Sequence, residues 1–185
     1  MRFVGLCSLV LLAPLTLLVA QTSPRSFLAY VHVLEINPTK PNQVNACVIV
    51  GDDGQFRYEV TPSSEERVPS NTKVYLGHLS ATTLQRLKQL LAAPDLASLT
   101  SSEPHGSLLN SYRLEVSLRI HRRDQTQELV MISDRPGNLP ASVWRFVPWM
   151  EDLRKTFGPP NKGVLPRHCA SLDVTSDFQP GLQQR

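Results

Sequence analysis

An unbroken alternation of apolar and polar residues between positions 112 and 121 constrains the fold more than any other feature of the chain. The residues read YRLEVSLRIH, and their apolar members are Tyr112, Leu114, Val116, Leu118 and Ile120. Successive side chains of a β-strand point to opposite faces. One face of this segment is therefore buried and the other is wet, as in an antiparallel sheet with a core on one side.

Five further segments are predicted to be strands. The apolar run 27–36 ends at Asn-Pro-Thr-Lys-Pro, which cannot continue a hydrogen-bonded ladder. The runs 44–50 and 56–60 are joined by Gly-Asp-Asp-Gly, a hairpin signal because aspartate and glycine tolerate positive φ. Residues 73–79 are predicted to form another strand, and residues 129–132 return beside the alternating strand in a second hairpin.

Two segments have the periodicity of helices. The first can be capped by Ser80 or Thr82, and Pro94 ends it. Its apolar face consists of Leu84, Leu87, Leu90 and Leu91. The second segment covers residues 143–157 and contains Pro148, which removes a hydrogen bond and kinks a helix. We therefore expect two short helices in series, or one bent helix, in the second segment.

The order of these elements predicts the fold class. Strands, a helix, a strand hairpin and a helix follow one another with short connections. This order indicates an α+β fold in which two helices pack on one face of an antiparallel sheet of about four to six strands. The expected single domain spans residues 26–158, and residues 159–185 are expected to be a C-terminal tail.

Residues 1–20 have the pattern of a secretory signal peptide. One arginine precedes an uncharged apolar run, and small residues follow around Ala20. The run is close to the ~17-residue lower limit for a membrane span, although Pro14 interrupts it. Two outcomes stay open: cleavage, which releases the remainder to the periplasm or the exterior, and retention as a membrane anchor. In both cases we expect the rest of the chain to be exported.

The cysteines fit an exported protein. Cys7 lies in the leader, so Cys47 and Cys169 remain after cleavage, in a compartment where disulfides persist. A disulfide between them would tie the tail to an early strand and close a loop of about 120 residues. By restricting the unfolded chain, such a loop would stabilise the fold by ~4 kcal/mol. Alternatively, the two thiols are unrelated and Cys47 is a small buried hydrophobe. We favour the bridge, because an exposed thiol at Cys169 is a liability outside the cytoplasm.

The charge of the chain is small and dispersed. The 19 basic and 16 acidic residues become 18 and 16 once the single arginine of residues 1–20 is removed, which leaves a net charge of +2. Basic residues are locally dense only at 119–123, and acidic residues follow them. Nucleic acid is therefore not an expected partner, and membrane contact is expected only if the leader is retained.

One combination of elements resembles known proteins. A hairpin with an aspartate-glycine turn leads to Gly77-His78-Leu79-Ser80, then to the leucine-rich helix, the alternating strand pair and the closing helix. Over residues 46–157 this combination resembles a set of small exported bacterial proteins whose functions are uncharacterised. The resemblance implies structural roles only: a glycine that lets the strand turn, a serine cap and leucines that pack.

The common catalytic motifs are missing. The sequence has no Gly-x-Ser-x-Gly elbow, no His-Glu-x-x-His, no Walker glycines and no paired Cys-x-x-Cys. Among the five histidines, only His168 has a close neighbour that could share a metal ion, Cys169. We therefore expect no metal, no cofactor and no catalytic residues.

The leading hypothesis is a non-enzymatic exported domain that binds a protein, a peptide or an envelope component. An open edge of an antiparallel sheet can add a strand from such a partner. Trp144 and Trp149, the two tryptophans of the chain, are either core residues or, where exposed, aromatic anchors for the partner.

Two alternatives belong to other classes. One is an exported hydrolase or metal-dependent enzyme built from dispersed residues such as His78, His105 and Asp134. The other is a structural envelope protein, anchored in the membrane by a retained leader.

Overall fold

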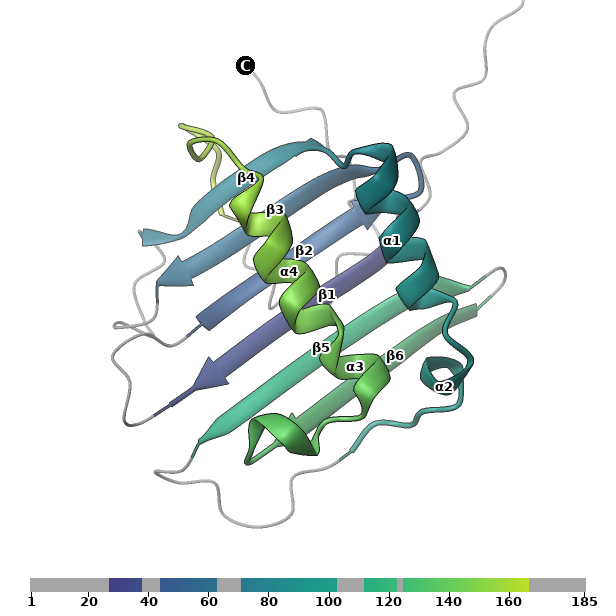
Figure 1. Ribbon diagram of the computed structural model, residues 1–185. Coiled ribbons are helices and arrows are strands. Elements are labelled where there is room, and N and C mark those ends of the chain that lie inside the picture. Colours follow the sequence, from purple (N-terminus) through teal and green to yellow (C-terminus); the bar gives the residue numbers. More distant parts are fainter. Residues whose placement is uncertain (1–26, 38–43, 63–70, 103–111, 123–124, 167–185) are drawn as a thin grey trace, which may run out of the picture.

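The computed structural model describes residues 27–37, 44–62, 71–102, 112–122 and 125–166. These residues form one six-stranded antiparallel sheet, and the helices lie on one of its faces (Figure 1). The predicted α+β class is confirmed, with six strands, at the upper end of the predicted range.

The strands lie where the sequence predicted them. They are β1 (Phe27–Ile36), β2 (Val44–Gly51), β3 (Gln55–Pro62), β4 (Lys73–His78), β5 (Arg113–Arg122) and β6 (Gln125–Ser133). The helical elements are α1 (Ala81–Leu91), α2 (Pro94–Ala97), the 3-10 turn η2 (Pro136–Asn138), α3 (Ala141–Trp144) and α4 (Phe146–Lys155). The second hairpin is tighter than predicted, because β5 and β6 extend their pairing to Arg122 and Gln125.

Strand β1 lies in the middle of the sheet, whose order is β4-β3-β2-β1-β5-β6. On one side β1 pairs with β2, where Tyr30 is opposite Ile49. On the other side it pairs with β5, where Val31 is opposite Leu118. The first four strands thus form a meander, and the chain crosses the sheet through α1 and α2 before β5 joins the free side of β1 (Figure 1).

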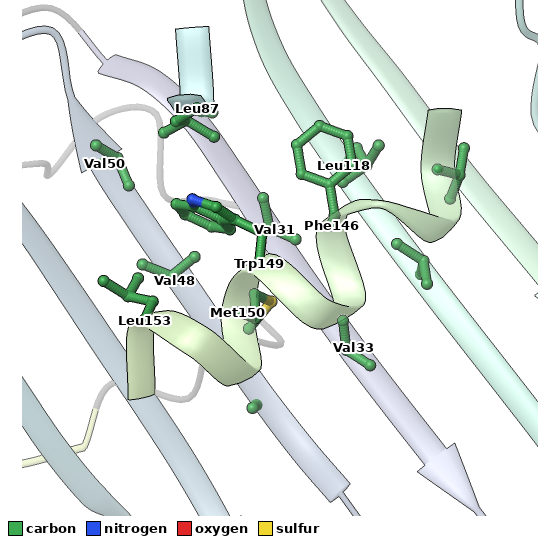
Figure 2. Close-up of a cluster of buried hydrophobic side chains, with 14 of the residues drawn as sticks. Val31, Val33, Val48, Val50, Leu87, Leu118, Phe146, Trp149, Met150 and Leu153 are labelled. Carbon is green, nitrogen blue, oxygen red and sulfur yellow. The ribbon is translucent and has the colours of Figure 1, made fainter. Parts of the chain in front are cut away.

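The main core fills the space between the sheet and the helices. Figure 2 shows Trp149 and Phe146 of α4 pointing toward the sheet, close to Val31 of β1. Trp149 is 1% exposed and Phe146 is 0% exposed. Burial of each large apolar side chain contributes roughly 1.5–3 kcal/mol, so this layer is the largest source of stability.

Helix α1 begins after Ser80, one of the two predicted caps. The Ser80 hydroxyl oxygen accepts a hydrogen bond from the backbone N–H of Thr83 at 3.1 Å. Leu87 and Leu91 are buried, whereas Leu84 and Leu90 lie at the margin of the core. Helix α1 ends at Leu91, and Pro94 is the first residue of the single turn α2, which was not predicted.

The closing helical segment consists of two short helices in series, one of the two predicted forms. Their break is at Arg145, however, and not at Pro148. Pro148 is the third residue of α4, in the first turn, where a missing N–H costs little. Phe157 lies beyond the end of α4, so the predicted helical range 143–157 is wrong at its last two residues.

The Gly-Asp-Asp-Gly segment forms the predicted tight turn between β2 and β3. Gly54 has a φ of 86° and donates its N–H to the Gly51 carbonyl at 3.0 Å. The Asp53 carboxylate accepts the N–H of Gln55 at 2.9 Å. Asp53 therefore serves the turn geometry.

The buried phenol of Tyr58 predicts a loss of stability at alkaline pH. Burial, the largest cause, raises its pKa from 10.0 to about 12. The folded protein thus holds this proton more tightly than the unfolded chain, and the contribution is complete below pH ~10 and lost as pH rises toward ~12. We expect the free energy of unfolding in urea to fall by about 2 kcal/mol more in wild type than in Tyr58→Phe over that range.

The remaining decline in Tyr58→Phe is expected from other groups, since burial also raises the pKa of Tyr30 and of Tyr112. Identical pH dependence in wild type and Tyr58→Phe would contradict the assignment.

Candidate functional site

A pocket of about 370 Å³ lies beside β4 on the helix side of the sheet. It is bounded by β4, by the start of α1 and by the chain that follows α4, and its size is at the small end for ligand sites. Its lining includes the rings of Phe56, Tyr75 and Phe157, together with Gly77, His78, Ser80, Thr83 and Thr156.

The apolar part of the pocket is a group of stacked rings around Phe157. Its ring centroid is 5.0 Å from that of Phe56 and 5.0 Å from that of Tyr75, with interplanar angles of 17° and 26°. Tyr58 meets the same ring edge-on at 5.1 Å. Each such pair is worth about 0.5–1.5 kcal/mol beyond burial. Phe157 therefore fixes the chain after α4 against β3 and β4.

Gly77 makes room for one of these rings. A Cβ atom at Gly77 would lie 3.1 Å from the Phe56 ring, tighter than nine in ten real Cβ contacts, so the ring would have to shift. The backbone φ of Gly77 is not positive, unlike that of Gly54. The glycine is thus needed for space against Phe56, and not to let the strand turn as the sequence suggested.

The rim of the pocket is polar and carries almost no charge. The hydroxyls of Ser80 and Thr83 bond to each other at 2.8 Å, and the Thr156 hydroxyl donates to the Leu153 carbonyl at 2.6 Å. His78 is exposed at the rim, and no Asp, Glu, Lys or Arg is among the described residues that line the pocket. Such a pocket suits a neutral ligand with an apolar or aromatic group.

The outer edge of β4 is capped by the chain that follows α4. The N–H of Asn161 donates to the Val74 carbonyl at 2.9 Å. The Asn161 side-chain oxygen accepts the N–H of Leu76 at 2.8 Å. One residue therefore occupies two neighbouring backbone groups that an added strand would need.

The outer edge of β6 is capped in a similar way by two serines. The N–H of Ser102 donates to the Val130 carbonyl at 3.0 Å, and the Ser101 hydroxyl accepts the Val130 N–H at 3.0 Å. The Ser102 hydroxyl accepts the N–H of Ile132 at 3.3 Å. The expectation of open edges is therefore wrong at these positions on both sides of the sheet.

The two tryptophans take different roles. Trp149 is in the core, as the first of the two interpretations held. Trp144 in α3 is 38% exposed, so its ring is accessible to a partner. They lie in different helices, Trp144 in α3 and Trp149 in α4, on either side of the break at Arg145.

The dispersed catalytic residues of the enzyme alternative do not converge. His78 ends β4 and Asp134 follows β6, so they lie at opposite edges of the sheet. Five strand spacings separate those edges, roughly 24 Å. Asp134 accepts a hydrogen bond from Asn138 at 3.1 Å, and His105 lies outside the described residues. Among the described residues, no group of three or more His, Cys, Asp or Glu side chains could hold a metal ion.

The predicted cysteine pair is only half described. Cys47 is 1% exposed and belongs to a small cluster on the face of the sheet that has no helix. Cys169 lies outside the described residues, so the pairing stays a prediction.

The leader also lies outside the described residues, so cleavage and retention both stay open. Among the helices that are described, none is both long and apolar enough to cross a membrane.

Comparison with known proteins adds no assignment. No protein-family model and no curated protein matches this chain. The resemblance to small exported bacterial proteins therefore stays a prediction that depends on the quoted sequence elements.

The different burial of the tryptophans predicts different costs of truncation. Trp149→Ala removes a ring that is 1% exposed, and we expect it to lower the free energy of unfolding by about 3–5 kcal/mol. Trp144→Ala should lower it by less than about 1 kcal/mol. Urea unfolding followed by circular dichroism measures both, and similar losses for the two variants would contradict the assigned positions.

Proposed function

We propose that the chain is an exported, non-enzymatic domain that binds a protein, a peptide or an envelope component through the pocket beside β4. The observation that carries the proposal is the uncharged pocket of about 370 Å³ with stacked aromatic rings. Convergent ionisable groups mark catalytic sites, and this pocket has a single exposed histidine. The edge-to-edge separation of His78 and Asp134 also argues against the enzyme alternative.

The pocket suits one or two apolar side chains of a larger partner. Aromatic rings supply contact area at low entropic cost, and the hydroxyls of Ser80 and Thr83 at the rim can bond to a neutral main chain. The capped edges at Val74 and Val130 make strand addition unfavourable, because a partner would first have to displace Asn161 or the serines. Binding by side-chain insertion is therefore the favoured mode.

Export is the second part of the proposal, and it depends on residues 1–20. We expect the intact mass of the exported product to correspond to a chain that begins after Ala20. A full-length mass in a membrane fraction would favour the anchored envelope protein, and a full-length product in the cytosol would contradict export altogether.

A pair of threonine substitutions tests the binding surface. Thr156 is exposed in the pocket lining, and Thr126 is exposed on β6 at the opposite edge of the sheet. Thr156→Arg and Thr126→Arg add the same charge and bulk at the two places. We expect Thr156→Arg to reduce the material retained from an envelope extract at least tenfold at modest salt, and Thr126→Arg to retain as much as wild type.

Equal urea midpoints for the two variants would show that a difference in retention is not caused by unfolding. Wild type that retains nothing would contradict a binding function of this kind. Equal retention by both variants would place the binding surface outside the pocket.

A further inference from the structure

The face of the sheet without helices carries a second buried cluster. Tyr30, Cys47 and Ile49 are 4%, 1% and 6% exposed, with Phe27 packed beside them. The alternation of β1 and β2 turns them away from Val31 and the helix-side core. The helix-free face of such a sheet is ordinarily solvated. These side chains therefore need a cover, and no helix or strand of the described residues lies over them (Figure 1).

The chain after α4 leads to this face. Asn161 caps the edge of β4, and four residues later the Leu165 carbonyl accepts a hydrogen bond from Arg57 at 2.7 Å. Arg57 also forms an ion pair with Glu59 at 2.5 Å. In the sheet register Arg57 is opposite Ile49, and Glu59 is opposite Cys47. The end of the described chain thus lies beside the second cluster.

We propose that residues 167–185 lie across the helix-free face and cover Tyr30, Cys47 and Ile49, held there by a Cys47–Cys169 disulfide. Cys47 is one strand and two residues from Arg57, roughly 8 Å. The four residues from Leu165 to Cys169 span up to ~14 Å when extended, so the tail reaches Cys47. The inference uses the export part of the proposed function and is independent of the pocket.

The composition of the tail fits this place. It carries apolar side chains that can cover the cluster, namely Leu172, Val174, Phe178 and Leu182. Its charged side chains are two arginines and two aspartates, so they carry no net charge when His168 is neutral. Charges on the helix-free face also pair with each other: Arg113 with Glu115 at 2.7 Å, and Arg119 with Glu128 at 2.5 Å. A neutral apolar segment meets no unfavourable net charge there.

Formation of the bridge is a two-electron oxidation. Each thiol loses one hydrogen as the S–S bond forms. The electrons pass by thiol–disulfide exchange to a disulfide-bearing oxidant of the exported compartment, which becomes a dithiol. Glutathione disulfide replaces this oxidant in a test with the purified chain.

Peptide mapping without reduction tests the bond. After refolding in glutathione disulfide, we expect a linked peptide pair that contains Cys47 and Cys169 and is two hydrogens lighter than the two thiol peptides. The bond in the refolded chain and also in the cellular product supports both this inference and export. The bond in the refolded chain alone supports this inference and counts against export. Its absence from both would overturn the inference.

Alkylation of Cys47 tests the cover separately from the bond. Cys169→Ser leaves a single thiol after residue 20 and keeps the whole tail. Adding Leu172→Asp and Phe178→Asp to Cys169→Ser places charges where the tail should contact the cluster. We expect Cys47 of the triple variant to react with iodoacetamide at least tenfold faster than Cys47 of Cys169→Ser.

The fluorescence of Trp149 and Trp144 shows whether the helix side remains folded in both proteins. Equal alkylation rates with unchanged fluorescence would overturn the tail as the cover of this face.

Discussion

The pairing of β1 on both of its sides is the interaction on which the rest of the structure depends. Its hydrogen bonds to β2 and to β5 join the first four strands to the hairpin that comes much later in the chain. Its alternate side chains also enter two different clusters, Val31 on the helix side and Tyr30 on the other. Without β1, the first four strands would no longer be joined to the β5–β6 hairpin. Both buried clusters would also lose the side chains that β1 contributes to them.

The capped positions limit how a partner could pair with the sheet edges. Asn161 occupies the edge of β4, and Ser101 and Ser102 occupy the edge of β6. Capped edges protect a monomeric sheet from aggregation by strand pairing. Under the proposed function, recognition falls to side chains, and the stacked rings around Phe157 form the apolar part of the pocket.

Local pattern predicted the sheet well, because alternation at 112–121 and apolar runs bounded by turn residues elsewhere both favour strands. It also predicted the cap at Ser80 and the turn at Gly54. It did not predict the break at Arg145, the position of Phe157 or the capping of the edges. Those features are set by contacts between distant segments, which neither periodicity nor composition records. The pocket belongs to this second group, since its residues come from three separate stretches of chain.

Amide hydrogen exchange measured residue by residue by NMR tests the central claim, a sheet centred on β1 with each edge capped at specific positions by its own chain. The decisive amides point outward from the edge strands: Leu76 on β4, and Val130 and Ile132 on β6. The account predicts that they exchange at least a hundredfold more slowly than in an unfolded peptide, as hydrogen-bonded amides do. Exchange at the unfolded rate while β1 stays protected would show that the edges are open, and would contradict the account.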